Sequence, residues 1–433
     1  IYGGSITAIL INTPGTANSA ATCLDGYPMA TKLGQPGRAL SISTMASTFG
    51  GLFSACALLF TAPLLSKIAL NFGVPEMFAL GVFGLSIVTA VSSHSIIKGL
   101  IGAILGLLLG TVGIDATSAT MRFTFGTTYL IGGVQFVALL IGLFAIAEVM
   151  SFAESVRKGQ NFTVETDYKI KGAGFSLKEG LAQTKNAIVS ALIGVGIGIL
   201  PGIGGSTAGI LSWMTAKKTS KHPEKYGTGI MDGVVASETS NNAVIGGALI
   251  PLLTLGIPGD GTAAIFLGGL LIHGLAPGSQ LFTTHADSAY GLLFGLLLAQ
   301  FFILLFGFFG APLYSRITRV PSNVLIPVIA VLCVLGAYSY RKLAFDMFVA
   351  LFFGIVGYYM SKANIPMAPF VLAFVLGGQC EISWRRAWML MKNDFVGYWA
   401  HPLPLALLAI DLFMLIWPFL PSKKNNKSET PTV

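Results

Sequence analysis

The feature that most constrains this chain is a polar cluster placed directly before a short apolar run that ends in a Pro-Gly break. The polar cluster occupies positions 237–242 (SETSNN), the apolar run positions 243–257, and the break positions 258–261 (PGDG). A helix over the apolar run rises about 22 Å at 1.5 Å per residue, short of a hydrocarbon core of roughly 30 Å. The pattern therefore predicts a helix that stops inside a membrane. Backbone broken at that depth must line a cavity or lie buried in protein, and secondary transporters place their sites there.

Composition independently places the chain in a membrane. Of its 433 residues 54% are hydrophobic and 10% are charged, with a mean hydropathy of +0.76, whereas a soluble domain carries about 25% charged residues. The net charge of +8 is then read as loop lysines and arginines, and no nucleic-acid partner is expected. Four cysteines without a C-x-x-C spacing predict neither a metal site nor a disulfide framework.

We predict an all-α polytopic membrane protein with about ten to twelve membrane segments, Pro-Gly-broken helices and re-entrant hairpins. The tail at 422–433 is basic, which favours the cytoplasm. Besides the central stretch, the apolar segments expected to enter the membrane are 39–66, 77–91, 99–114, 123–147, 186–216, 261–284, 288–315, 320–340, 347–361, 363–380 and 395–420.

One of these segments favours a re-entrant hairpin. Residues 186–216 carry no charge, and Pro201-Gly202 stands at their midpoint. The polar segment 151–185 before them and Lys217-Lys218 after them are both basic, and basic loops prefer the cytoplasm. We therefore expect both ends on the cytoplasmic side and the Pro-Gly tip partway across, with a single long span as the alternative.

The chain repeats its Pro-Gly break. Residues 1–16 run from a Gly-Gly pair through a short apolar run to Asn12-Thr13-Pro14-Gly15, as residues 245–260 do to Gly256-Ile257-Pro258-Gly259, with one residue of slippage at the start. Such pairs indicate an internal duplication, for which we predict two inverted repeats. The first would cover 1–150 and be incomplete at its N-terminus. A polar linker at 151–185 and a second repeat with accessory helices at 186–421 would follow.

Broken helices suit the binding of a carboxylate. Free backbone N–H groups and about half a positive charge lie at a helix start, and glycine lets a ligand approach the backbone closely. A tight loop between two helices is the structural alternative. The predicted substrate-binding residues are Asn12, Thr13, Pro14, Gly15, Thr16, Gly202, Gly204, Gly205, Ser206, Thr207, Ser240, Asn241, Asn242, Pro258, Gly259, Gly261 and Thr262.

Four acids near the breaks are candidates for coupling to a cation or proton: Asp25, Asp115, Glu238 and Asp260. Each has a structural alternative. Asp260 has the sequence context of a helix N-cap, Glu238 stands where a polar segment could face water, Asp25 could cap a helix, and Asp115 could pair with Arg122. His273 is expected to be a packing residue. No cofactor is expected beyond a coupling ion.

Seven motifs together resemble the large membrane subunit of the tripartite tricarboxylate transporters. They are residues 2–6 (YGGSI), 12–15 (NTPG), 24–30 (LDGYPMA), 122–126 (RFTFG), 200–205 (LPGIGG), 237–243 (SETSNNA) and 256–259 (GIPG). The resemblance covers nearly the whole chain. It implies a permease of the bacterial inner membrane that takes up a carboxylate such as citrate, driven by a Na+ or H+ gradient. It also implies a periplasmic solute-binding protein and a small membrane subunit as partners, and a homo-oligomer is possible.

The resemblance also sets an expectation about the N-terminus, because the first-half partner of the Pro201 hairpin is absent. If the halves are repeats, about 55 to 70 further residues are expected before Ile1. An anion channel is the rival function. An intramembrane hydrolase is disfavoured because Gly205-Ser206-Thr207 lacks the strand-to-helix turn and the placed histidine of a nucleophile elbow, so no enzyme is expected.

Overall fold

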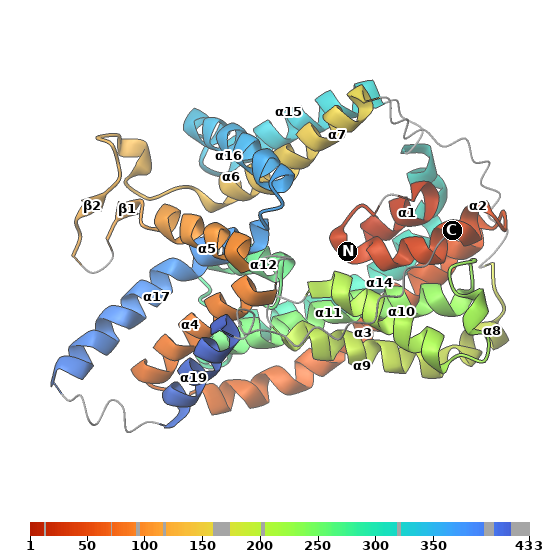
Figure 1. Cartoon of the computed structure of the whole chain (residues 1–433), viewed down its shortest axis with the longest axis horizontal. Helices are drawn as coiled ribbons and strands as arrows, with labels where there is room; N and C mark the ends of the chain where they lie inside the picture. The colour runs from red at the N-terminus through yellow and green to blue at the C-terminus, as the bar shows by residue number, and fades with distance from the viewer. Residues whose placement is uncertain are drawn as a thin grey trace, which may run out of the picture.

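The chain folds almost entirely into helices, as Figure 1 shows for the computed structural model. The prediction of an all-α polytopic membrane protein is confirmed. The structure describes residues 1–12, 14–70, 72–91, 96–115, 118–158, 174–200, 204–317, 322–393 and 402–416. Within these ranges the one sheet is a two-stranded antiparallel hairpin in which Gly113 faces Arg122.

Among the described residues, four helical stretches are long and apolar enough to cross a membrane. They are α3 (Pro36–Ala69), the continuous stretch Phe136–Arg157, residues Ala286–Gly310 of α14 (Ala286–Ile317), and α16 (Ala344–Lys362). With 34 residues, α3 rises about 51 Å and extends well beyond the hydrocarbon core.

The other described elements, together with the three that make up the Phe136–Arg157 stretch, complete the fold. In chain order they are α1 (Tyr2–Ile11), the 3-10 helix η1 (Ala17–Leu24), α2 (Gly26–Thr31), α4 (Val74–Val91), α5 (Ile96–Gly110), β1 (Gly113–Ile114), β2 (Met121–Arg122), η2 (Thr128–Leu130), α6 (Phe136–Leu140), the π-helical turn η3 (Ile141–Ile146), α7 (Ala147–Arg157), α8 (Leu177–Ala182), α9 (Thr184–Ile199), α10 (Gly204–Thr219), η4 (Pro223–Lys225), α11 (Met231–Leu255), α12 (Gly261–Ile272), α13 (Leu281–Thr284), α15 (Ser322–Arg341), α17 (Met367–Asn393) and α19 (Pro402–Ile416).

Helix α11 lies at the centre of one half of the molecule, packed against α3, α9, α10 and η1 (Figure 1). Glycine residues allow the backbones of these helices to approach each other closely. A methyl group on Gly50 of α3 would overlap the carbonyl oxygen of Thr239, and one on Gly194 of α9 would overlap that of Ser240. Small residues at helix interfaces allow this approach in membrane proteins. The backbones of α3 and α9 therefore cover the polar residues of α11.

The other half is built from α4 to α7 together with α15, α16, α17 and α19 (Figure 1). Its apolar core gathers Leu139 and Leu143 of the Phe136–Arg157 stretch with Phe353 of α16 and Phe370 of α17. The predicted repeat boundaries stay a prediction. Elements assigned to different repeats nevertheless pack closely, as α3 does with α11.

Several predicted membrane segments begin or end elsewhere in the structure, and the one expected at 261–284 divides into α12 and α13. The segment expected at 123–147 becomes helical only at Phe136, where the Gln135 side chain accepts a hydrogen bond of 2.8 Å from the Val137 amide. Before it the chain forms β2 and η2, and Phe125 is 84% exposed. The segment expected at 363–380 continues as α17 to Asn393, because Glu381 and Arg385 find charged partners.

The polar linker meets the helical core at α8. Ser176 and Glu179 form a capping box, and Glu179 also pairs with Arg38 of α3 at 2.7 Å. The amide and hydroxyl of Ser176, followed by Arg38, lower the pKa of the Glu179 carboxyl. These contacts fix the start of the α9–α10 unit against the base of α3.

The glycine contacts of α9 give a first prediction. Gly194→Ala places a methyl group on the α11 backbone, so we expect it to lower the free energy of unfolding by about 1–3 kcal/mol. Gly196→Ala on the same helix meets no atom within 4 Å and should be neutral or stabilising by about 0.5–1 kcal/mol. Denaturation of both variants in detergent micelles measures the difference. Equal stabilities would contradict the backbone-close packing of α9 on α11.

Candidate functional site

The polar cluster of the central stretch lies inside a helix. Helix α11 begins at Met231, so residues 237–242 occupy its second to fourth turns, and each of the six is at most 1% exposed. The expectation that Glu238 could face water is wrong. The hydroxyls of Ser237 and Ser240 donate to carbonyls of the preceding turn, so these two groups are satisfied within the helix. Six polar side chains are therefore buried together among membrane helices.

Glu238 sits in a shell of hydroxyl groups from three elements. Its carboxyl accepts hydrogen bonds from Thr22 of η1 and, at 2.7 Å, from Ser47 of α3. Ser5 of α1 and Ser43 of α3 lie next to the same carboxyl, but their own oxygen atoms make no hydrogen bond within the described residues. Glu238 forms no ion pair in that part of the chain.

The rest of the cluster keeps polar atoms without protein partners. Both side-chain polar atoms of Asn241, the amide oxygen of Asn242 and the hydroxyl of Thr239 are buried and make no hydrogen bond to any described residue. The other end of the Asn242 amide donates to the Glu238 carbonyl at 3.0 Å. Buried polar groups are almost always paired, so such orphans mark a place for a ligand or ordered water. Asn241 offers such a molecule both a donor and an acceptor.

The first Pro-Gly break folds back on α1. The helix ends at Asn12, which adopts the left-handed conformation at φ 54°, and the Gly15 amide donates to the Gly4 carbonyl at 3.1 Å. A methyl group on Gly15 would lie 2.9 Å from the α-carbon of Gly4, so glycine is required there. Asn12, Pro14 and Gly15 are exposed. Thr13 lies outside the described residues.

The second break has the same construction at the end of α11. Gly256 is left-handed at φ 75°, and a methyl group on Gly259 would lie 2.8 Å from the α-carbon of Ala248. Asp260 then caps α12, accepting a hydrogen bond of 2.7 Å from the Ala263 amide. The N-cap alternative for Asp260 is confirmed. Pro258 and Gly259 are buried, Gly261 begins α12, and Thr262 is exposed.

The two breaks correspond residue by residue. The left-handed helix ends (12 and 256), the packed glycines (15 and 259) and the next helix starts (17 and 261) are each separated by 244 positions. The predicted slippage of one residue therefore does not extend to the breaks. Thr16 of the first break stands where Asp260 stands in the second. One break carries a neutral cap and the other an acid.

A helical hairpin connects the two breaks. The apolar segment 186–216 forms α9 and α10, which pack side by side, so two hairpin arms are confirmed in place of a single long span, while the cytoplasmic side of their ends stays a prediction. A methyl group on Gly259 would lie 2.5 Å from the Gly198 carbonyl oxygen, and one on Gly205 would lie 2.8 Å from the Asn18 side chain. Gly204 and Ser206 are half-buried and Thr207 is exposed. Residues 201–203, with Pro201 and Gly202, lie outside the described residues.

These contacts order the breaks along α11. The first break rests on Gly4, next to the Ser5 that approaches Glu238, whereas the second rests on Ala248. Ten residues of helix separate Glu238 from Ala248, about 15 Å. The hairpin of α9 and α10 contacts both regions: Gly205 lies against Asn18 near the first break, and Gly198 lies against Gly259 of the second break. The predicted two-sided clamp stays a prediction, and Asn18 joins the candidate residues. No local pattern indicates Asn18, whereas Ser43 and Ser47, four residues apart on an apolar helix, form a polar stripe that the sequence shows.

Asp25 is held by protein donors alone. One carboxylate oxygen accepts amide hydrogen bonds from Gly227, Gly229 and Ile230 at 2.8–3.1 Å, and the other accepts from the Trp213 indole at 2.7 Å. The carboxylate therefore fastens the loop before α11 to the start of α2. A coupling ion at Asp25 stays a prediction, but it would compete with four hydrogen bonds.

Asp115 belongs to an ion network at the β-hairpin. Arg385 of α17 pairs with it at 2.8 Å, while Arg122 lies 3.8 Å away and binds Glu381 with both terminal nitrogens at 2.8 and 3.1 Å. The hydrogen bond to Glu381 raises the pKa of the Arg122 guanidinium. The network joins β2 to α17, away from α11 (Figure 1). The expected Asp115–Arg122 pair is thus the weaker of the contacts, and the role of Glu381 was missed because it lies 259 residues along the chain from Arg122.

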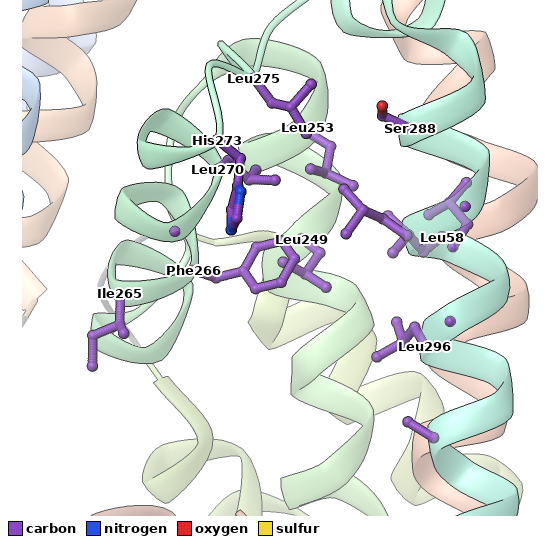
Figure 2. Close-up of a pocket in the computed structure, with 16 residues that line it drawn as sticks. Leu58, Leu249, Leu253, Ile265, Phe266, Leu270, His273, Leu275, Ser288 and Leu296 are labelled. Atoms are coloured by element: carbon purple, nitrogen blue, oxygen red, sulfur yellow. The ribbon is translucent and has the colours of Figure 1, made fainter. Parts of the chain in front are cut away.

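The large cavity of Figure 2 lies apart from the polar cluster. It has a volume of about 1000 Å³ and is walled by leucines such as Leu249, Leu253 and Leu296, with Phe266. His273 and Ser288 are its polar residues, and His273 is exposed, so its expected packing role is wrong. A carboxylate needs several donors. This apolar cavity does not supply them.

Comparison with known proteins agrees with the motifs. The model of the tripartite tricarboxylate transporter TctA family matches residues 1–372. An uncharacterised 52.8 kDa protein in the TAR-I ttuC' 3' region of Agrobacterium vitis is 34% identical over 99% of this chain and 84% of its own length. An uncharacterised protein in the TAR-II ttuC' 3' region of the same organism is 30% identical over 54% of this chain and 96% of its own length. No solved structure matches.

The contacts of Asp25 give a second prediction. Asp25→Ala leaves three backbone N–H groups without their acceptor, so we expect a loss of at least about 3 kcal/mol in the free energy of unfolding. Trp213→Phe removes one of the four hydrogen bonds and should cost about 1 kcal/mol. Denaturation in detergent compares the two. Wild-type stability of Asp25→Ala would show that this carboxylate does not hold the loop and would return it to the coupling candidates.

Proposed function

Because this chain belongs to the tripartite tricarboxylate transporter TctA family, we propose that it carries out secondary active uptake of a tricarboxylate or related carboxylate such as citrate. The chain is a multi-pass membrane protein of a transporter family. In the proposal it lies in the bacterial inner membrane and a Na+ or H+ gradient drives uptake. A periplasmic binding protein delivers the substrate and a small membrane subunit completes the system; assembly of the permease as a homo-oligomer stays a prediction.

The observation that carries this proposal is the set of unpaired polar atoms on α11. The Asn241 amide, the Thr239 hydroxyl and the amide oxygen of Asn242 are neutral groups that make no hydrogen bond to the described protein. A desolvated cationic side chain would be costly in the membrane, whereas amides, hydroxyls and backbone N–H groups bind a carboxylate at lower cost. Together with Ser240, they form the substrate side of the proposed site.

The breaks differ in the charge at the helix start that follows them, and we therefore assign the substrate to the first one. The start of α12 already carries the carboxylate of Asp260, which accepts a hydrogen bond from the Ala263 amide and offsets the partial positive charge of the helix N-terminus. The starts of η1 and α10 carry no acid: Thr16 caps the one, and Gly204, Gly205, Ser206 and Thr207 form the other. We therefore assign the carboxylate groups of the substrate to these two starts and to Asn12 and Gly15.

Coupling belongs to an acid separate from the substrate-binding groups. Three of the four candidate acids have donors that only donate: Asp25 binds backbone amides and an indole, Asp115 binds arginine, and Asp260 binds a backbone amide. Glu238 faces hydroxyls alone among its described hydrogen-bond partners and lies one helical turn from Asn241 and Asn242. This proximity supports linkage between an ion at Glu238 and a substrate at the neighbouring amides.

The substrate assignment is tested on Asn241. Asn241→Ala removes the unpaired amide, and a hydrogen bond to a charged group contributes about 1.5–3 kcal/mol, so citrate affinity should fall roughly tenfold to a hundredfold. Binding of [14C]citrate to the purified chain measures the affinity, and thermal unfolding checks the fold. Wild-type affinity in a folded variant would remove α11 from the substrate site.

A matched control and a transport assay complete the test. Asn364→Gly removes an exposed amide at a left-handed turn that glycine tolerates, and should leave citrate binding unchanged. In proteoliposomes a carrier gives uptake that saturates with citrate and requires an ion gradient. Flux that rises without saturation and needs no gradient would favour a channel.

A further inference from the structure

The groups around the Glu238 carboxyl bear on whether the coupling ion is Na+ or H+. It contains a single carboxyl group, the hydroxyls of Ser5, Thr22, Ser43 and Ser47, and no charged partner among the described residues. The carboxyl group is 0% exposed. Resting on the proposed transport function, we infer that the coupling ion is a proton and that the carboxyl group of Glu238 binds it.

Hydroxyl groups suit both protonation states of a carboxyl. A hydroxyl donates one hydrogen bond and accepts two. Thr22 and Ser47 donate to the ionised carboxylate, and when Glu238 is protonated its own O–H finds an acceptor in Ser5 or Ser43, whose oxygen atoms are unpaired. Burying an isolated carboxylate without a charged partner is costly, so this position favours a carboxyl group that can bind a proton.

The contacts at the carboxyl group have the geometry of hydrogen bonds. Ser47 lies 2.7 Å from one carboxyl oxygen, and Thr22 donates to the other. A hydrogen atom bridges each pair of oxygen atoms, and such hydroxyl partners can stay in place when a carboxyl group gains or loses a proton.

The groups facing Glu238 leave its charge free to change. From η1 the titratable group is the Cys23 thiol, and from α1 and α3 the facing groups are hydroxyls. The charges of the neighbouring helices lie near their ends: Arg38 of α3 pairs with Glu179, and α9 and α10 carry Lys185, Lys217 and Lys218. A nearby fixed cation would hold Glu238 ionised, and the described elements packed against it supply none.

The hydroxyl shell of Glu238 is continuous with the first break. Ser5 follows Gly4, whose carbonyl accepts a hydrogen bond from the amide of exposed Gly15. A substrate bound at the break would therefore act on this shell. This contiguity provides the physical link that coupled transport requires.

Infrared spectroscopy of the purified chain tests the protonation directly. At neutral pH the wild type should show the carbonyl stretch of a protonated carboxyl group that Glu238→Gln lacks, and sodium ions should not remove it. Asp411→Asn, which alters another buried acid on α19, should retain the Glu238 band. The absence of a Glu238-dependent band at any pH, or its loss on adding sodium at constant pH, would overturn the inference.

Transport separates this inference from the proposed function. In proteoliposomes free of sodium, a pH gradient should drive citrate accumulation, Glu238→Gln should reduce it at least tenfold while reducing exchange less, and Asp411→Asn should retain both. Wild-type liposomes that exchange no citrate would count against the proposed function. Citrate exchange with accumulation driven by sodium alone, and unchanged in Glu238→Gln, would overturn the proton assignment only.

Discussion

Backbone-close packing of α11 on α3 and α9 is the constraint on which the rest of the structure depends. Gly50, Gly194 and Gly246 let three helices approach until a single methyl group would overlap backbone oxygen. This approach seals the polar turn of α11 from lipid and brings Ser43 and Ser47 of α3 to Glu238. Association of membrane helices has little hydrophobic driving force, so such close packing and buried hydrogen bonds hold the bundle together.

The acids of the chain show how environment assigns roles to one side-chain type. Asp25 is saturated by four protein donors, Asp115 is paired with Arg385, and Asp260 caps a helix. Glu238 has hydroxyl partners and orphaned amides beside it. A carboxylate held by arginine or amides contributes to structure. A carboxyl group surrounded by hydroxyls, which both donate and accept, can gain or lose a proton at a lower free-energy cost.

The repeated break shows what duplication preserves and what it changes. The left-handed helix end, the packed glycine and the following helix start recur at a constant spacing, because backbone conformation and close packing specify them. The cap is not preserved: Thr16 is neutral and Asp260 is acidic. Two breaks of the same construction thus differ in charge, and the proposed substrate site uses the neutral one.

The sequence by itself determined the membrane class, the helical composition and the positions of the breaks, since hydropathy, proline and glycine act within a few residues. It misplaced the start of the helix at Phe136, where a side-chain cap decides the boundary, and it could not bury Glu238, whose polar neighbours alone suggested water. Only the tertiary structure decided the partners of Glu238 and Arg122. Thr22 and Ser47 lie 216 and 191 residues from Glu238, and Glu381 lies 259 from Arg122, so no local pattern records these contacts. Burial and hydrogen bonding between distant segments are properties of the packed helices. They make Asp25 the anchor of a loop, Asp115 part of an ion network and Glu238 a proposed proton site.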